Sequence, residues 1–368
     1  MKRVLCLALA LVLVFALTAC GGSKTPAASP PPAASSAPPA ASPAPPASSG
    51  NEYPWNPDNI RSQTFILAHG LPADGASGLQ YNAFCVAVED LSGGKMKVDQ
   101  RVGGTLLLDT ETLDAVIAGT VDFIHSKGSF ITGTVGDIAP LTIAGYYGGD
   151  DWFGFIDEIR DLVSSIYADY GIKFVGSLYD ACTGIASVNK PIAQPSDVVG
   201  MSFRVSGTWL SKTVEAWGGT ATTIALADLA DAFNRGIVEG VMTSWAVIVP
   251  FKLYEVCEYI TTTNLAEGYA ALLMNEARWN ELNSDEQALI EYAGRIFEKE
   301  AVRIVNEFFD MYLQEVKDSG RNQVSALSPE AEQEFMTLSY KVFDEMEKEL
   351  SPKGIQLIEI VKRINGLS

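Results

Sequence analysis

Two stretches of the chain, 117 residues apart, share one pattern, and this repeat limits the fold more than any other feature. The first, Asp114 to Asp122, is DAVIAGTVD, and the second, Asp231 to Glu239, is DAFNRGIVE. In each, a helical segment meets a glycine where a helix C-terminus favours a left-handed residue, and β-branched residues follow at once. Each stretch therefore predicts a helix, a glycine stop and a strand.

The segments before these stretches also match in order. Each copy predicts a strand, a helix, a glycine pair and a second strand. These elements are expected at residues 64–68, 77–91, 93–94 and 95–102 in the first copy, and at 201–205, 208–217, 218–219 and 220–226 in the second. Two β-α-β-α-β units imply two similar α/β lobes, with a ligand at the carboxyl ends of the strands. Chance similarity between common α/β units is the alternative.

One long amphipathic segment indicates how the lobes are joined. Ser284 and Gln287 are expected to form a capping box, and apolar residues then recur at helical spacing until Gly320. The segment has about 35 residues, or roughly 50 Å at 1.5 Å each, which is more than one lobe needs. We therefore expect a helix across both lobes. A coiled-coil dimer is the alternative, but the apolar stripe is too wide for a strict a/d seam.

The first residues are typical of a secretory signal. Lys2 and Arg3 precede an apolar run that is shorter than a membrane-spanning helix, and the sequence LTAC ending at Cys20 forms a lipobox. Residues 1–19 are therefore predicted to be a cleaved signal peptide, and Cys20 to be lipidated. Two or three acyl chains make stable anchoring plausible. A short membrane anchor with an incidental cysteine is the alternative.

A tether and an acidic folded part are expected after the signal. Residues 26–49 contain only Pro, Ala and Ser, so residues 20–52 should form the lipidated cysteine and an extended tether. Residues 1–19 hold two of the 26 basic residues and none of the 45 acidic ones, so 24 basic residues remain and the formal charge is −21. This charge argues against a nucleic-acid partner and leaves the lipid as the membrane contact.

Three cysteines, Cys85, Cys182 and Cys257, remain once Cys6 leaves with the signal and Cys20 is lipidated. They lie far apart and form no CxxC pattern, so neither a disulfide framework nor a cysteine metal site is predicted. Cysteine packs as a small hydrophobic residue, which favours buried free thiols over a single bridge.

Several short segments occur in an order and spacing that are specific when taken together. They are LAHG at 67–70, LSGGK at 91–95, GGTL at 103–106, GTVD at 119–122, DVVGMSFRV at 197–205, GIVEG at 236–240 and KLYEVCEYIT at 252–261. In these segments the chain resembles, over about residues 62–320, the dicarboxylate-binding type of substrate-binding protein of tripartite ATP-independent periplasmic (TRAP) transporters. The resemblance implies a periplasmic-binding-protein-like α/β fold, in which hinge strands cross between two lobes and a long helix spans both.

The expected lobes are approximately residues 62–182 plus 263–304 for lobe I and residues 183–262 plus 305–366 for lobe II. The function implied by the resemblance is capture of a small organic acid between the lobes. The acid would pass to a small four-helix and a large twelve-helix membrane subunit for ion-driven uptake. We expect a monomer outside the cytoplasm, held to the membrane by the lipid on Cys20.

The resemblance assigns Arg204 to the ligand carboxylate. A planar guanidinium can donate two parallel hydrogen bonds to a carboxylate in a dry cleft, so the chemistry fits. The alternative is a surface arginine on a strand edge, with Phe203 and Val205 pointing inward and Arg204 outward.

The other candidate ligand-binding residues carry less weight. Where the family often has an asparagine, this chain has Thr243-Ser244-Trp245, which puts the usual dicarboxylate or sugar-acid specificity in doubt. Thr243 could donate a hydrogen bond, and Trp245 could wall the cleft or instead pack in the core. Further candidates lie at strand exits or close to Arg204. These are His69, Tyr179, Ser126 and Trp209. For His69 and Tyr179, a structural role is equally open.

We expect neither an enzyme nor a cofactor or metal site. His69 and His125 are the only histidines, and the chain contains no G-x-S-x-G, H-E-x-x-H or P-loop pattern. The nearest alternative is a binding lipoprotein of an ATP-driven (ABC-type) importer, which shares the signal, the tether and the two lobes. A purely structural surface lipoprotein is a third class, and it would show no ligand-induced change.

Overall fold

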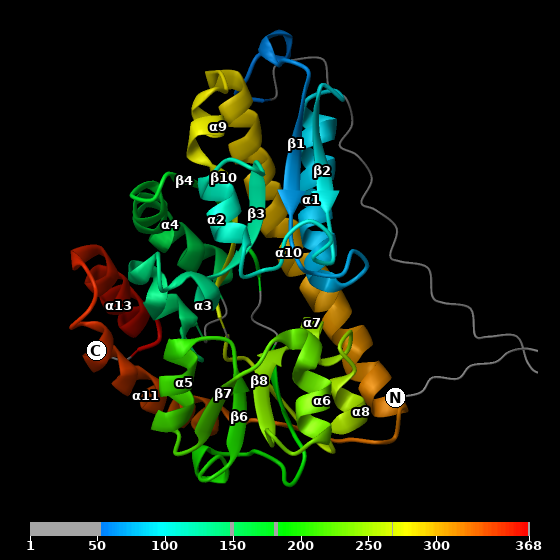
Figure 1. Cartoon of the computed structure of the whole chain (residues 1–368), viewed down its shortest axis with the longest axis vertical. Helices are drawn as coiled ribbons and strands as arrows, with labels where there is room; N and C mark the ends of the chain where they lie inside the picture. The colour runs from blue at the N-terminus through cyan, green and yellow to red at the C-terminus, as the bar shows by residue number, and fades with distance from the viewer. Residues whose placement is uncertain (1–52, 148–150, 180–182, 267, 367–368) are drawn as a thin grey trace, which may run out of the picture. The chain divides into compact units, whose positions relative to one another are not determined.

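The computed structural model describes residues 53–147, 151–179, 183–266 and 268–366 of the chain (Figure 1). The predicted signal peptide, Cys20, the tether and Cys182 lie outside the described residues. Within those ranges, no helix is both long enough and apolar enough to cross a membrane. Cys85 and Cys257 are buried free thiols, as predicted.

A five-stranded sheet forms the core of the first half, in the order β2-β1-β3-β10-β4. Its strands are β1 (Gln63–Ala68), β2 (Met96–Arg101), β3 (Phe123–Lys127), β4 (Ile172–Ser177) and β10 (Ala270–Asn275). Strands β1, β2 and β3 are parallel because α1 (Ala76–Leu91) and α2 (Thr112–Ile117) return the chain between them. Strand β10 is antiparallel to both β3 and β4. The predicted β-α-β-α-β order of the first copy is confirmed.

A six-stranded sheet forms the core of the second half, in the order β11-β9-β5-β8-β6-β7. Its strands are β5 (Thr183–Ser187), β6 (Ser202–Val205), β7 (Thr220–Thr223), β8 (Gly240–Ser244), β9 (Tyr259–Thr263) and β11 (Gln323–Ala326). Helices α5 (Thr208–Ala216) and α6 (Leu229–Asn234) connect the parallel strands β6, β7 and β8. Strand β7 ends at Thr223 rather than at Leu226, because Leu226 begins the 3₁₀ helix η4 (Leu226–Asp228). The Ile224 carbonyl between them accepts a hydrogen bond from Arg204.

The two repeated glycines end helices α2 and α6 as expected. Gly119 has φ 71° and Gly236 has φ 67°, in the left-handed region. Each helix closes with a Schellman pair of backbone bonds, which includes Thr120 N–H donating to Ala115 and Ile237 N–H donating to Ala232. The strands that follow, β3 and β8, begin three residues later than the sequence predicts, at Phe123 and Gly240.

The chain passes between the sheets three times, from β4 to β5, from β9 to β10 and from β10 through helix α10 (Ser284–Asp318) to β11, and α10 packs on both halves (Figure 1). The N-terminal part of α10, including Leu289 and Phe297, belongs to the core around the five-stranded sheet. Its C-terminal part, including Phe308 and Val316, belongs to the core around the six-stranded sheet. Gly294 permits close contact with β4, since a Cβ there would lie 2.5 Å from the Val175 carbonyl oxygen.

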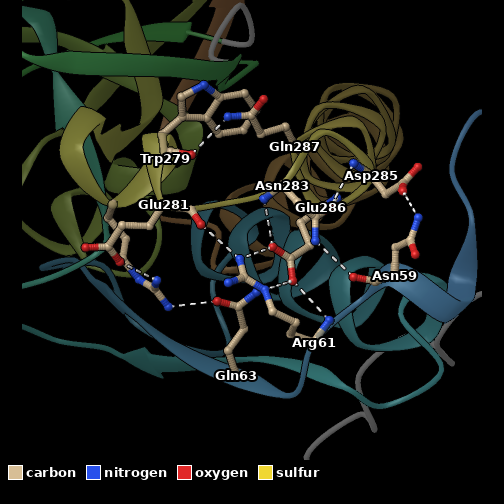
Figure 2. Close-up of polar contacts among 10 residues, drawn as sticks. Asn59, Arg61, Gln63, Trp279, Glu281, Asn283, Asp285, Glu286 and Gln287 are labelled. Atoms are coloured by element: carbon tan, nitrogen blue, oxygen red, sulfur yellow. Dashed lines mark hydrogen bonds and ion pairs between the residues drawn. The ribbon is translucent and has the colours of Figure 1, made fainter.

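The capping box of α10 lies one residue earlier than predicted, at Asn283 and Glu286 instead of Ser284 and Gln287 (Figure 2). The Asn283 side chain accepts the backbone N–H of Glu286 at 3.0 Å, and the Glu286 carboxylate accepts the N–H of Asn283 at 3.0 Å. Glu286 is also paired with Arg61, which Ser284 and Gln287 could not provide. The box therefore also fixes the segment that precedes β1.

The C-terminal helices are α11 (Pro329–Ser339), α12 (Phe343–Met346) and α13 (Pro352–Ile364). Helix α13 packs on the first half of the molecule, where Lys353 pairs with Asp169 at 2.6 Å and Asn365 Nδ2 donates to the Tyr146 carbonyl at 3.0 Å. The expected assignment of residues 305–366 to lobe II stays a prediction, although α13 contacts η2 (Gly136–Thr142) and α4 (Trp152–Ala168) in the first half. The other lobe boundaries stay predictions.

Short helices complete the description. They are α3 (Gly128–Ile131), α7 (Trp245–Ile248), α8 (Leu253–Val256) and α9 (Glu276–Asn280), with the 3₁₀ helices η1 (Pro57–Asn59), η2 (Gly136–Thr142), η3 (Pro195–Asp197), η4 (Leu226–Asp228) and η5 (Tyr340–Val342). Helix α3 directly follows β3, and α7 directly follows β8. The equivalent central parallel strands of the two sheets thus both lead into a helical turn.

Candidate functional site

Arg204 lies inside the second half of the molecule and not on its surface. It belongs to β6, which lies between β7 and β8, and the residue is 4% exposed. Its Nε donates to the Ile224 carbonyl oxygen at 2.8 Å, which fixes the plane of the guanidinium. The neighbours Phe203 and Val205 are buried as well, since an inner strand is covered on both faces. The alternative of an outward-facing surface arginine is therefore wrong.

Thr243 lies on the strand next to Arg204 and on the same face of the sheet. Arg204 is in register with Val241 of β8, and Thr243 is two residues further along that strand, towards its carboxyl end. Its hydroxyl is buried and has no hydrogen-bond partner among the described residues. A guanidinium and an unpaired hydroxyl thus occupy neighbouring positions at the strand ends where a ligand is expected.

Ser126 occupies the corresponding place in the first half. Ala68 at the end of β1 is in register with Ile124 of β3, and Ser126 is two residues beyond Ile124. Like Thr243, the Ser126 hydroxyl is buried and lacks a partner within the described ranges. A buried polar atom without a partner costs free energy, so each hydroxyl marks a place where a ligand oxygen or nitrogen would be favourable.

His69 lies directly after β1 and is held by protein groups on both sides of its ring. The Leu71 backbone N–H donates to its Nδ1 at 3.2 Å, and its Nε2 lies 2.8 Å from Gln100 Nε2. The ring also packs on Tyr81, whose hydroxyl lies 2.6 Å from His125 Nδ1. Burial lowers the pKa of His69 and of His125 to about 4. The placement of His69 fits the structural alternative.

Tyr179 lies two residues after β4, at the same sheet edge as Ser126. Its ring meets Trp152, the first residue of α4, edge to face with ring centroids 5.2 Å apart. Trp152 is also in contact with Tyr147 and Phe155. The Trp152 indole nitrogen is buried without a partner in the part of the chain that the structure describes. Apart from the i,i+3 spacing of Trp152 and Phe155 in α4, no sequence pattern marks the residues of this aromatic cluster as neighbours.

Two candidate residues are placed in hydrophobic cores. The Trp245 ring is 1% exposed, packs edge to face on Phe309 of α10, and donates from its Nε1 to the Thr183 carbonyl at 3.1 Å. Of the two interpretations open for Trp245, the structure supports core packing. Trp209 lies near the start of α5 and is buried with Leu210 in a core that also includes residues of the first half.

A contact between the halves was also missed. Ser129 in α3 and Ser206 directly after β6 place their hydroxyl oxygens 3.1 Å apart, and both are buried. No sequence pattern marks two serines 77 positions apart as partners. No cluster of three or more potential metal ligands occurs among the described residues.

Two α/β halves, joined by crossing strands and a shared helix, with polar groups at the carboxyl ends of their parallel strands, define the class of two-lobed solute-binding proteins. The family model described as "Bacterial extracellular solute-binding protein, family 7" (DctP) matches residues 67–349. The chain belongs to this family. Membership places it among extracytoplasmic solute-binding proteins and not among enzymes.

Individual relatives agree with this assignment. The C4-dicarboxylate-binding periplasmic protein DctP of Rhodobacter capsulatus is 23% identical over 306 residues, which cover 80% of this chain and 89% of that protein. A solved TRAP periplasmic solute-binding protein of Sulfurospirillum deleyianum, with bound succinate, has a TM-score of 0.72 at 19% identity and covers 83% of this chain and 100% of its own. Another from Roseobacter denitrificans, with bound β-D-glucuronate, has a TM-score of 0.74 at 18% identity and covers 82% and 99%. The predicted TRAP resemblance and fold class are confirmed.

Proposed function

We propose that this protein captures a small organic acid between its two lobes, with Arg204 as the group that binds the carboxylate. The single observation that carries the proposal is the burial of this arginine on an inner strand, where one N–H already fixes its orientation. A preoriented guanidinium in a dry environment binds a carboxylate through short, charge-assisted hydrogen bonds. The carboxylate ligands named for two solved neighbours support the same chemistry.

The rest of the ligand is proposed to contact uncharged hydroxyls. Thr243 and Ser126 come from different halves, and each has a buried oxygen that can donate or accept a hydrogen bond. Such groups suit a hydroxyl, keto or second carboxylate oxygen of the ligand. Keto, hydroxy, aromatic and dicarboxylic acids are therefore all candidates. Ligand contacts of Tyr179, His69, Trp209 and Trp245 stay predictions, with His69 and Trp245 the least favoured by their surroundings.

Delivery to the membrane is proposed to follow closure. A carboxylate held by Arg204 in one lobe and by polar groups of the other would favour hinge rotation towards a closed state. The closed monomer would then dock on a small four-helix and a large twelve-helix TRAP subunit, and a lipid on Cys20 would keep it near them. The TRAP relatives favour this ion-driven system over the alternative of an ATP-driven importer.

The first experiment identifies the ligand. Mass spectrometry of small molecules that copurify with the protein, followed by thermal-shift measurements with succinate, D-glucuronate and a panel of keto, hydroxy and aromatic acids, should reveal an acid that stabilises the fold. Ligand binding raises the melting temperature by mass action, so a specific ligand stands out at concentrations well above its Kd. If amines or neutral sugars stabilise the protein and no acid does, the proposed ligand class is wrong.

The second experiment tests Arg204 by titration calorimetry. Arg204→Met keeps the apolar stem and removes the charge, and we expect the acid to bind at least about 100-fold more weakly, since charge-assisted hydrogen bonds are among the strongest. Arg235→Met is the matched control, because Arg235 lies on the surface of the same half and pairs with Asp231. Equal affinities of wild type and Arg204→Met would refute the assignment.

A further inference from the structure

The two halves of the molecule touch close to the proposed binding site. In each half, the residue in contact follows a proposed ligand-binding residue along the chain. Ser129 comes three residues after Ser126, and Ser206 comes two residues after Arg204. Their hydroxyl oxygens are 3.1 Å apart. Strand β3 and helix α3 thus connect Ser126 to this contact in the first half, and β6 connects Arg204 to it in the second half.

Gly207 lets the backbones approach at this point. A Cβ at Gly207 would lie 2.5 Å from the Ser129 carbonyl oxygen and 3.2 Å from the Ser129 Cβ. Real Cβ atoms do not come that close to a main-chain oxygen, and a main-chain oxygen cannot rotate away as a flexible side chain can. The φ of Gly207 is 178°, an extended conformation open to any residue. Space, not backbone conformation, is therefore what requires glycine at this position.

We infer that the contact of Ser129 with Ser206 and Gly207 is a positioning contact that sets the spacing between the two halves of the binding site. The inference rests on the proposed function, because it assigns a role to residues that do not themselves bind the ligand. Where the two halves touch, the contact limits how near Ser126 of one half comes to Arg204 of the other. A ligand that bridges the halves fits only when this spacing is kept.

The test uses a series at Gly207 in the mature full-length chain. Gly207→Ala and Gly207→Val place increasing bulk against the Ser129 carbonyl, and titration calorimetry with succinate and with D-glucuronate measures affinity. We expect an acid that binds the wild type to bind Gly207→Ala about tenfold more weakly and Gly207→Val more weakly still, because overpacking at a close contact is costly. Gly133→Ala is the matched control, since a Cβ there meets nothing within 4 Å.

A distance measurement makes the result independent of the ligand. Spin labels at Lys97→Cys in the first half and Val199→Cys in the second occupy exposed positions, and Cys182→Ser removes a thiol that could also take the label. Pulsed electron-spin resonance should show longer inter-label distances for Gly207→Val than for the wild type or Gly133→Ala, with unchanged far-ultraviolet circular dichroism. An unchanged distance distribution in Gly207→Val overturns the inference, as does unchanged affinity for an acid that the wild type binds. Either result leaves the Arg204→Met test of the proposed function unaffected.

Discussion

In both halves of the molecule, an acidic residue just before the third parallel strand binds the main chain of the first. Asp122 donates its backbone N–H to the Ile66 carbonyl at 3.1 Å, and its carboxylate accepts the Ile66 N–H at 2.7 Å. Glu239 makes the same two bonds to Ser202, at 2.7 and 3.1 Å. The repeat in the sequence is therefore a repeat of hydrogen bonds that hold corresponding strands together.

The two halves differ in the side chains that they carry at equivalent strand positions of the proposed site. Counted from these bonds and from the strand register, Arg204 of the second half corresponds to Ala68 of the first, while Thr243 corresponds to Ser126. Both halves have a hydroxyl side chain at the equivalent position, Ser126 and Thr243, whereas only the second half has an arginine, Arg204. The repeated strand pairing gives the two halves equivalent side-chain positions. The proposed selectivity for acids comes from the second half, in which one of these positions is an arginine.

Chain length also separates the halves. Ile66 and Asp122 are 56 positions apart, whereas Ser202 and Glu239 are 37 apart. Part of the difference is in the helix after the first strand, since α1 has 16 residues and α5 has 9. The longer α1 packs along α10, so the first half is tied more extensively to the shared helix.

The largest expected effect concerns the histidines, which are confined to the first half. Both have a pKa of about 4 because burial disfavours the charged ring, whereas unfolded histidine titrates near 6.5. The unfolded chain binds these protons first, so the stabilisation is fully present above pH 6.5 and is lost as pH falls from 6.5 towards 4. Urea unfolding should show a loss of about 4 kcal/mol in the free energy of unfolding between pH 7 and pH 5.

The control is a chain without histidine. His69→Gln combined with His125→Gln removes every histidine, so carboxylates alone determine the remaining pH dependence in this range. The free energy of unfolding of this variant should change much less between pH 7 and pH 5 than that of the wild type. If the free energy of unfolding falls equally in both proteins between pH 7 and pH 5, the histidines do not cause the loss of stability.

The next effect compares the two acidic residues that hold the strands. Asp122→Ala should lower the free energy of unfolding by about 2 kcal/mol and Glu239→Ala by about 1 kcal/mol, since hydrogen bonds to charged partners are the stronger ones. Asp122 also accepts from the Arg278 guanidinium at 3.2 Å, whereas the second oxygen of Glu239 binds the neutral amide of Asn189. Chemical denaturation measures both, and a larger cost for Glu239→Ala would contradict this ranking.

Much of the fold could be predicted from the sequence because its signals are local. Gly119 and Gly236 end helices through their own backbone conformation, and the apolar period of α10 is independent of what it packs on. The sequence predicts the capping box one residue late because Ser284 and Asn283 are both good cap residues. Only the pairing of Glu286 with Arg61, more than 200 positions away, distinguishes them.

The site could be predicted less completely because it depends on long-range packing. The family resemblance predicts Arg204, and an expected place after a strand predicts Ser126, which in the structure lies within β3. The two possible roles of Trp245 could not be separated, since the carbonyl of Thr183 that accepts its N–H lies 62 positions earlier. The Ser129–Ser206 contact depends on how the two halves meet, which neither serine encodes locally.

The repeated glycines offer a third comparison, in which the halves should behave alike. Gly119→Ala and Gly236→Ala each force a side chain into the left-handed region, which costs about 1 to 2 kcal/mol. Neither new Cβ clashes, since the nearest atom at Gly119 is 3.6 Å away and none lies within 4 Å at Gly236. Thermal unfolding should show similar losses, and Gly133→Ala, which is not in that region, should lose little. A large difference between the two would mean that the helix ends are not equivalent.

The smallest effect separates binding from stability at the equivalent hydroxyls. Ser126→Ala and Thr243→Val each remove a buried oxygen that lacks a partner within the described chain, so each should stabilise the free protein by up to about 1 kcal/mol. Each should also weaken binding of the acid by about fivefold, because a neutral hydrogen bond contributes about 1 kcal/mol. Denaturation and calorimetry on the same samples test both expectations. If one variant loses affinity and the other does not, the ligand contacts that half alone, and the equivalence of the two positions is limited to the strand pairing.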